Sequence, residues 1–280
     1  SPVYVLHEIV HNKHVISELA AKGTIFVKDL SEIPEGETCI FSAHGVSVAT
    51  EQQAGLLRLK TIYATCPLVT SIHRMVEKYH QQGFDVIIIG HHGHPEVEGT
   101  AGRVLERVHV VANVQEAEEL SVNNPDKVAY VTQTTLSQED IEGIREVLET
   151  RFTGIKGPSR SNICYATQNR QNAVRFLASK SDLVFVVGSK NSSNSNRLKE
   201  VAEQAGGISY LIDDFRDIDP SCLDGAKVFG LTAGASAPER LVNGVLEFLN
   251  DNLTITTITE MEGTDETISF KPATSSVNRH

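Results

Sequence analysis

The chain has 280 residues, of which 40% are hydrophobic and 22% are charged, a composition typical of globular proteins. Its length predicts two or three packed domains. No apolar run approaches the roughly 18 residues that a membrane span requires, so no membrane segment is predicted. The formal net charge is −11 and no basic stripe offsets it, which excludes nucleic acid as an expected partner.

The four cysteines are too few for a disulfide scaffold, and the first residues lack the pattern of a signal peptide. We therefore expect a reducing, intracellular compartment. The opening residues, SPVYVLHEIVHN, begin in a predicted strand without an initiating Met. This start predicts that the natural chain begins further upstream.

Five strands, each followed by a polar cluster, are predicted from runs of β-branched and aromatic residues. In chain order these segments span residues 39–47, 86–99, 128–137, 183–197 and 227–240. Helical patterns lie between them, for example at 66–83 and 196–207. The alternation predicts an α/β fold with mostly parallel sheets. Because ligands bind beyond the carboxyl ends of parallel strands, several of these loops are expected to share one site.

Domain boundaries are expected in short loops near residues 65 and 163, because no linker composition appears anywhere in the chain. The predicted division is a first α/β domain at 1–65, N-terminally incomplete, a second at 66–163 and a third at 164–250. The remaining tail, 251–280, reads as two short strands around a Gly turn, followed by a disordered end.

The first chemical motif in the chain is HEIVH at residues 7–11, which matches the zinc-protease pattern of two His and a Glu on one helix. Such enzymes need a third ligand nearby, and the following residues supply no Gly-x-x-His continuation. A chance match is therefore the favoured interpretation, with a zinc hydrolase kept as an alternative.

A dense group of ionisable side chains follows the second predicted strand, in the segment HHGHPEVEG. It consists of His91, His92, His94, Glu96 and Glu98. Such a group suits a divalent metal, an anion or acid–base chemistry. So many titratable groups directly after a buried strand favour a functional site over a solvated turn. The role of each residue stays open at this point.

Ser and Asn fill all but one position of residues 189–196, just ahead of a predicted helix. Hydroxyls, amides and unbonded N–H groups at a helix start bind phosphate well, and one or two such residues would suffice for capping alone. An anion site with Ser192, Ser193 and Asn194 is therefore favoured over capping. Ser236 in TAGASAP also places a hydroxyl just ahead of a predicted helix, and two such phosphate-binding turns suit a diphosphate.

Cys66 in ATCPLVT and Cys164 in NICYATQN are each predicted between a short strand and a helix, where the helix dipole stabilises a thiolate. Their residue type suits metal ligands. They lie far apart in the sequence, so no local chelate exists, and two buried cysteines acting as small hydrophobes remain the alternative. Cys39 and Cys222 are predicted to be structural.

Eight motifs in fixed order carry a resemblance that covers residues 4 to about 245. They are HEIVHN, SAHGV, ATCPLV, GHHGHPEVEGT, TQTTLS, NICYAT, GSKNSSNSNR and TAGASAP. Together they resemble the LytB-type iron–sulfur enzymes, the 4-hydroxy-3-methylbut-2-enyl diphosphate reductases of non-mevalonate isoprenoid synthesis. The resemblance implies three small α/β domains in a trefoil around a central cavity. Each domain would give one Cys to a 4Fe–4S cluster.

The same resemblance assigns roles residue by residue. It makes Cys66 and Cys164 cluster ligands, and Glu96 and Thr134 the residues that serve the substrate hydroxyl. It gives the diphosphate to His11, His44, His94, Ser192, Ser193, Asn194 and Ser236. The family's remaining Cys lies in an N-terminal Asn-Pro-Arg-Gly-Phe-Cys-type motif, which this sequence does not contain. The chain as given is therefore expected to be inactive.

The implied reaction is reductive dehydroxylation to isopentenyl and dimethylallyl diphosphate, with electrons from a ferredoxin or flavodoxin-type donor. The expected location is the bacterial cytoplasm, or the plastid stroma for a plant or alga. Two rival functions are a non-catalytic phosphate- or metal-binding module and the zinc hydrolase that HEIVH suggests.

Overall fold

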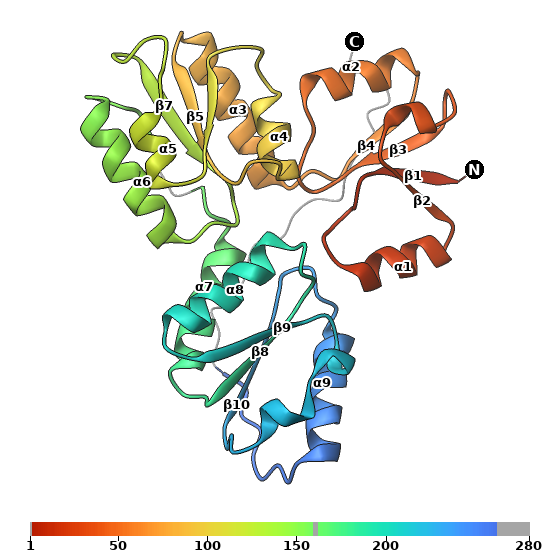
Figure 1. Cartoon of the computed structure of the whole chain (residues 1–280). Coiled ribbons are helices and arrows are strands. Elements are labelled where there is room, and N and C mark those ends of the chain that lie inside the picture. Colours follow the sequence, from red (N-terminus) through yellow and green to blue (C-terminus); the bar gives the residue numbers. More distant parts are fainter. Residues whose placement is uncertain (1, 159–161, 262–280) are drawn as a thin grey trace. The chain divides into compact units, whose positions relative to one another are not determined.

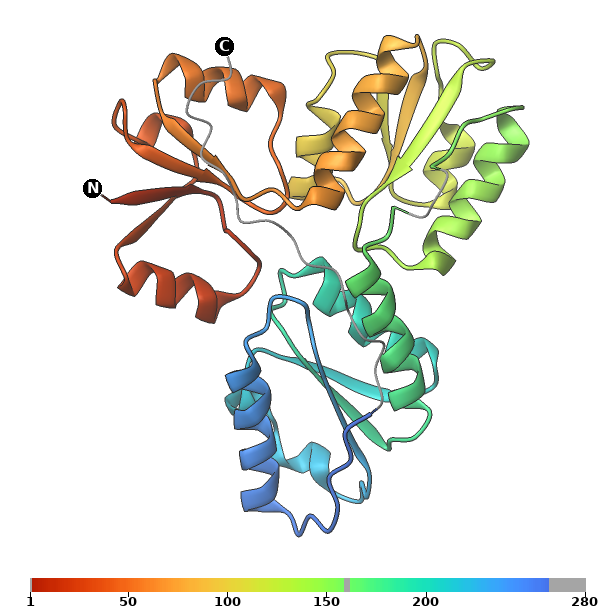
Figure 2. The ribbon, with the colours of Figure 1, turned by 180° about the vertical axis from the view of Figure 1, so that it is seen from behind.

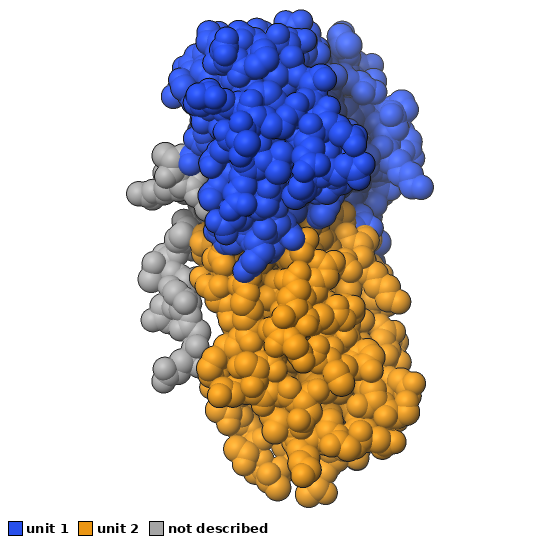
Figure 3. Space-filling view, turned by 60° about the vertical axis from the view of Figure 1, so that its left-hand side comes forward, with its two compact units in different colours: residues 1–10, 18–163, 269–280 blue, residues 11–17, 164–268 orange. Residues whose placement is uncertain are grey.

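The computed structural model describes residues 2–158 and 162–261 of the chain (Figure 1). Their contacts divide them into two compact units, coloured separately in Figure 3. Of the described residues, unit 1 comprises 2–10, 18–158 and 162–163, and unit 2 comprises 11–17 and 164–261. Within the described residues, no helix is both long and apolar enough to cross a membrane.

The first sheet belongs to unit 1 and has four parallel strands in the order β2-β1-β3-β4. Their bounds are β1 Val3–Leu6, β2 Thr24–Val27, β3 Thr38–Phe41 and β4 Lys60–Tyr63. The helices α1 (Lys13–Ala21) and α2 (Val48–Leu56) connect them, with a 3-10 turn at Leu30–Glu32. Cys39 and Phe41 of β3 are completely buried in the core of this sheet, so Cys39 is structural, as predicted.

The second sheet also lies in unit 1 and has the order β6-β5-β7, again with parallel pairing. Its strands are β5 Asp85–Ile89, β6 Val108–Val111 and β7 Val128–Thr132, and its helices are α3 Pro67–Gln81, α4 Pro95–Ala101, α5 Val114–Glu119 and α6 Gln138–Arg151. Ile87 and Ile89 pack in the cluster that includes α6, whereas Val86 and Ile88 pack in the cluster that includes α3. The orange helix α3 and the green helix α6 flank this sheet (Figure 2). Both faces of β5 are therefore covered, as a continuous apolar run in a parallel sheet requires.

The third sheet, in unit 2, repeats this plan with the parallel order β10-β8-β9. Its strands are β8 Leu183–Val187, β9 Ile208–Ile212 and β10 Phe229–Ala233, and its helices are α7 Tyr165–Ala178, α8 Ser193–Gln204 and α9 Glu239–Asn252, with 3-10 turns at Phe215–Asp217 and Pro220–Leu223. Phe185 of β8 packs in the cluster that includes α9, and Val184 and Val186 pack in the cluster that includes α7 and α8.

The predicted α/β class with parallel sheets is confirmed, and the five predicted strands are β3, β5, β7, β8 and β10. The strands β2, β6 and β9 were not predicted from the sequence. Each has few fully buried side chains, so a long apolar run is missing. The strands β5, β7 and β8 are recognisable because all of their side chains are buried.

The predicted boundary near residue 163 coincides with the division between the two units, and the one near residue 65 falls inside unit 1, between its two sheets. The three-domain division stays a prediction. In the tail, residues 254–261 have no regular secondary structure, so the strand predicted there is wrong. The rest of the predicted tail structure, at 262–280, lies outside the described residues.

Helix α4 lies unusually close to the turn after β3 because it carries a glycine at the contact. A Cβ on Gly99 would meet the carbonyl oxygen of Gly45 at 3.0 Å and the backbone nitrogen of Val46 at 3.3 Å. Gly45 itself has φ +75°, a conformation that favours glycine. This backbone-to-backbone packing connects the element after β5 with the element after β3.

We expect Gly99→Ala to destabilise unit 1 despite the higher helix propensity of Ala. Overpacking against backbone typically costs about 1–3 kcal/mol, whereas the propensity gain is about 1 kcal/mol. Gly143→Ala on α6 is the matched control, because a Cβ there makes only an ordinary 3.5 Å contact with Val114. Urea unfolding should show a loss for Gly99→Ala and a gain for Gly143→Ala. Equal gains for both variants would contradict the close-contact interpretation.

Candidate active site

Neighbouring strands of the second sheet end in two polar turns. The segment HHGHPE follows β5 and the segment QTT follows β7, and the two strands pair in parallel. Glu96, in the first turn of α4, is only 3% exposed. Its carboxylate accepts two hydrogen bonds from Thr134, one from the backbone N–H and one from the hydroxyl, each 2.7 Å long. A buried carboxyl and a threonine therefore form a pair at the carboxyl ends of two strands.

The buried environment of Glu96 favours the protonated, uncharged form of its carboxyl. Burial raises the pKa of Glu96 to about 7, although the two hydrogen bonds from Thr134 act in the opposite direction. A carboxyl with such a pKa is protonated in a large fraction of molecules near neutral pH. It is therefore able to donate a proton, which an exposed Glu with a pKa near 4.5 does poorly.

His94 caps α4 and contacts a second histidine of unit 1. Its Nδ1 atom accepts the backbone N–H of Glu96 at 3.1 Å, so the neutral ring carries its proton on Nε2. The rings of His94 and His44 meet edge to face, with centroids 5.6 Å apart. The His44 Nδ1 atom lies 3.3 Å from the Ser42 hydroxyl. The turns after β3 and β5 thus place two predicted ligands side by side.

The sequence reading missed His73 of α3, which supports the same turn. Its side chain is buried, and a Cβ on Gly45 would lie 2.6 Å from its ring. Burial, with a smaller effect from the positive charge of Arg103, lowers the pKa of His73 to about 4. His73 is therefore a neutral ring packed under the turn that carries His44. Its helical position gave no signal that distinguishes it from other core residues.

The remaining ionisable groups of HHGHPEVEG do not join Glu96. His92 pairs with Glu116 at 2.8 Å near the surface, and Glu98 accepts the N–H of Gly93 at 3.3 Å. The backbone N–H of His91 binds the side-chain oxygen of Gln133, a buried residue that the sequence reading did not single out. Among the described residues, no three His, Cys, Asp or Glu side chains are grouped as a metal site.

In unit 2, the predicted anion-binding residues follow β8 and β10. Ser192 is the N-cap of α8, and its hydroxyl accepts the N–H of Ser195. Asn194 is only 7% exposed, and neither polar atom of its side chain has a hydrogen-bond partner. A buried amide without partners costs free energy unless a ligand supplies them. Together with the helix start, Asn194 therefore supports an anion site.

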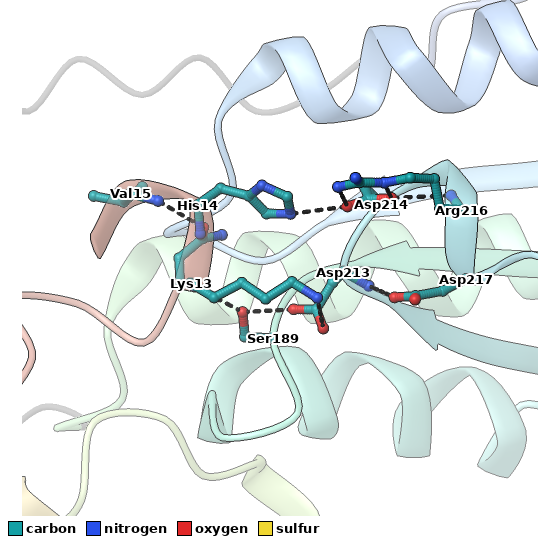
Figure 4. Close-up of polar contacts among 9 residues, drawn as sticks. Lys13, His14, Val15, Ser189, Asp213, Asp214, Arg216 and Asp217 are labelled. Atoms are coloured by element: carbon teal, nitrogen blue, oxygen red, sulfur yellow. Dashed lines mark hydrogen bonds and ion pairs between the residues drawn. The ribbon is translucent and has the colours of Figure 1, made fainter. Parts of the chain in front are cut away.

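The segment at residues 11–17 packs on both of these strand ends in unit 2. The Ser236 hydroxyl donates to the carbonyl oxygen of His11 at 3.2 Å, and the Lys13 N–H donates to the Ser189 hydroxyl at 3.3 Å. Figure 4 shows the Lys13 ammonium and the Ser189 hydroxyl meeting at Asp213, at 2.7 and 2.8 Å. His11 and Ser236, predicted as ligands of one diphosphate, are thus brought together.

The zinc hydrolase alternative is contradicted by the local structure of HEIVH. Residues 7–11 form bends after β1, His7 has φ +59°, and α1 begins only at Lys13. The helix starts there because Asn12 accepts the N–H groups of His14 and Val15. Without a helix, the His pair lacks the shared face that the zinc motif needs.

Cys66 and Cys164 are the N-cap residues of α3 and α7, and both are partly exposed. Neither side chain makes a capping hydrogen bond. Cys66 follows β4, as predicted, but the strand predicted before Cys164 is absent from the described residues there. Before it, Lys156 forms an isolated bridge to Ala129 of β7, and the Asn162 side-chain oxygen accepts the N–H of Thr132. Cys66 lies in unit 1 and Cys164 in unit 2, and their shared cavity stays a prediction.

Comparison with known proteins identifies the family. The family model described as "LytB protein" matches residues 1–250. A 4-hydroxy-3-methylbut-2-enyl diphosphate reductase from Desulfotalea psychrophila is 61% identical over 272 residues, covering 97% of this chain and 86% of the relative. The reductase of the same name from Azoarcus sp. strain BH72 is 51% identical, covering 96% and 86%.

A solved structure agrees with these sequence comparisons. The E-1-hydroxy-2-methyl-but-2-enyl-4-diphosphate reductase from Plasmodium falciparum matches with a TM-score of 0.93 and 35% identity, covering 97% of this chain and 86% of that one. The chain belongs to the LytB family.

We expect Thr134→Val to raise the pKa of Glu96 above its value of about 7, because the side-chain hydrogen bond from Thr134 lowers that pKa. Valine keeps the shape and the backbone N–H donor. The carboxyl titration is measurable by infrared spectroscopy or carbon NMR. Thr135→Val is the control, since the Thr135 hydroxyl bonds to Gln133 instead. An unchanged Glu96 titration in Thr134→Val would show that the hydroxyl does not act on this carboxyl.

Proposed function

We propose that this chain removes the hydroxyl group of 4-hydroxy-3-methylbut-2-enyl diphosphate by reduction, giving isopentenyl and dimethylallyl diphosphate. The relatives that bear this activity in their names support the substrate and the reaction. The observation in the structure that carries the proposal is the buried Glu96–Thr134 pair, a proton donor at the carboxyl ends of two strands. The reaction consumes two electrons and two protons, and it releases water.

The diphosphate is bound by neutral donors more than by fixed cations. In unit 2, the ligands are Ser192, Ser193, Asn194 and Ser236, and the unpartnered amide of Asn194 is the clearest sign of a missing acceptor. The N-terminus of α8 adds backbone N–H groups and the positive end of a helix dipole. His11, His44 and His94 complete the proposed set. On the neutral His94 ring, Nδ1 accepts the Glu96 N–H, so Nε2 is the ring's donor atom.

Glu96 supplies the proton that turns the leaving hydroxyl into water. Hydroxide is a poor leaving group, so a positioned acid lowers the barrier substantially. Thr134 holds the carboxyl through its N–H and its hydroxyl. When Glu96 is protonated, its proton can point to the Thr134 oxygen, and the threonine proton then turns toward the substrate. Thr134 thus orients the acid and relays its proton.

Two of the four cysteines, Cys66 and Cys164, fit the role of iron–sulfur cluster ligands. Both Cys66 and Cys164 are partly exposed at helix N-termini, so neither sulfur is enclosed in the core, and cysteines are the residues that hold such clusters. Cys39 does not fit, because complete burial raises the pKa of its thiol to about 11. When bound, a 4Fe–4S cluster supplies the electrons and a Lewis-acidic iron. A third thiolate belongs to an N-terminal motif that this sequence does not contain.

The electron donor is proposed to be a ferredoxin or flavodoxin-type protein, because such proteins deliver the two electrons one at a time. The bacterial relatives support a bacterial cytoplasm as the place where the reductase works.

We expect Glu96→Gln, in a chain that carries the cluster, to lower kcat by roughly 100-fold or more, the typical worth of a positioned acid. In the unmutated protein, kcat should fall as the pH rises through about 7, because Glu96 then loses its proton. That decline should be absent in Glu96→Gln. Glu98→Gln is the control, since exposed Glu98 lies two residues away on the same helix. Near-normal turnover in Glu96→Gln would reject the assignment.

We expect little stable cluster when the 280-residue chain is reconstituted with iron and sulfide without oxygen, and full occupancy after an N-terminal segment with the third Cys is added. In the extended chain, Cys66→Ser and Cys164→Ser should each lower the iron and sulfide content, while Cys222→Ser should not. Full occupancy in the 280-residue chain would show that another side chain replaces the third thiolate. Iron and sulfide analysis provides the measurement.

A further inference from the structure

The Ser195 side chain is confined between two glycines at the carboxyl ends of neighbouring strands. Ser195 is completely buried on the first turn of α8. A Cβ on Gly188, directly after β8, or on Gly234, directly after β10, would lie 2.2 Å from the Ser195 hydroxyl oxygen. Any larger residue at either position would therefore displace this hydroxyl. The fold keeps two glycines where they make room for one buried serine.

That buried hydroxyl bonds to the proposed diphosphate ligand Ser192. The Ser195 hydroxyl donates to the Ser192 Oγ atom at 3.1 Å, and the Ser195 N–H donates to the same oxygen at 3.3 Å. A serine hydroxyl has two acceptor lone pairs and one proton. Both lone pairs of Ser192 are thus used by Ser195, and the Ser192 hydroxyl can only donate.

The backbone of Ser192 is already bonded as well. Its N–H donates to the carbonyl of Ser189 at 2.9 Å, and its own carbonyl accepts the backbone N–H of Asn196 at 3.0 Å. The Ser192 hydroxyl proton is therefore the one hydrogen-bonding group of this residue left for a ligand. An anion, which only accepts hydrogen bonds, is the ligand that such a donor suits best.

We infer that Ser195 is a positioning residue for diphosphate binding: its buried hydroxyl fixes Ser192 as a donor, so that the Ser192 proton points to the anion. Gly188 and Gly234 are required because they leave space for the Ser195 hydroxyl. This inference rests on the proposed function, since it assumes that Ser192 binds diphosphate. Ser195 acts only through Ser192, which distinguishes it from a ligand and from a residue that merely fills space.

A double-mutant cycle on the full chain tests this dependence, with inorganic diphosphate as the ligand and titration calorimetry as the readout. Ser192→Ala should weaken binding about 10-fold or more, the effect of losing one bond to a charged group. Ser195→Ala should weaken it about 3-fold to 10-fold, because Ser192 can then rotate its proton away. Ser192→Ala with Ser195→Ala should bind within about twofold of Ser192→Ala alone. Thermal unfolding of each variant checks that the fold is intact.

A second set of variants tests the role of the glycines. Gly234→Ala should weaken diphosphate binding and lower the melting temperature, because the new methyl group meets the Ser195 hydroxyl. Adding Ser195→Ala should recover most of the melting temperature, since the 2.2 Å clash with the hydroxyl is removed and the remaining 3.3 Å contact with the Ser195 Cβ needs a shift of only a few tenths of an ångström, but it should not restore binding. Gly188→Ala is the control. Ser195→Ala should not rescue it, because the Ser195 Cβ would still lie 2.7 Å away.

The outcomes separate the inference from the proposed function. If Ser195→Ala weakens diphosphate binding by the same factor in the unmutated chain and in Ser192→Ala, the inference is overturned and the anion site remains. No effect of Ser195→Ala on binding would overturn it as well. If the unmutated chain binds no diphosphate, or Ser192→Ala binds it normally, the anion site of the proposed function fails and the inference fails with it. If the losses of diphosphate binding in Ser192→Ala and Ser195→Ala are coupled but the cluster-loaded chain has no reductase activity, the inference stands and the proposed reaction is rejected.

Discussion

The pair of hydrogen bonds between Glu96 and Thr134 is the interaction on which the chemistry of unit 1 depends. A carboxyl that is 3% exposed is costly unless its oxygens are bonded, and Thr134 supplies both bonds. This arrangement requires β5 and β7 to be parallel neighbours, so that the turns after them meet. It also requires α4 to begin within a few residues of β5. The architecture of the sheet is therefore the condition for a buried acid with a pKa of about 7.

Close backbone packing extends this arrangement to a second strand end. Gly99 lets α4 approach the turn at Gly45, and His73 fills the space beneath that turn. As a result, the rings of His44 and His94 lie edge to face. Each histidine is held by its neighbours before any ligand arrives, which reduces the entropy that binding costs.

In unit 2, the residues at the carboxyl ends of the strands suit the binding of an anion. Unit 1 buries an acid and keeps its charge low, whereas unit 2 presents hydroxyls and an amide that suit an anion. The residues after β8 and β10 are donors, and the segment at 11–17 is hydrogen-bonded to both strand ends. Asn194 is buried without partners, so unit 2 carries an unmet hydrogen-bonding requirement that unit 1 avoids at Glu96. A diphosphate satisfies that requirement under the proposed function.

The sequence by itself determined five of the strands, the parallel α/β class and the helix start at Cys66, whereas the helix predicted at 196–207 begins three residues earlier, at Ser193. These features are local: a run of buried β-branched residues and a capping residue have the same meaning in any fold. The motifs with their order were also sufficient to indicate the family. The strands β2, β6 and β9 could not be recognised, because few of their side chains are fully buried and their apolar patterns are short.

Only the tertiary structure decided which motif residues act together. In HHGHPEVEG it separated Glu96, bonded to Thr134, from His92, paired with Glu116, although both are equally plausible by residue type. It also showed that HEIVH is not a helical zinc motif, since the helix that would align the two His begins only at Lys13. Nothing in the sequence distinguished Ser195 from the rest of its Ser/Asn run, or His73 from other helix residues, because their roles depend on glycines in other segments. Burial and partner choice arise from contacts between segments far apart in sequence, and local patterns carry no information about those contacts.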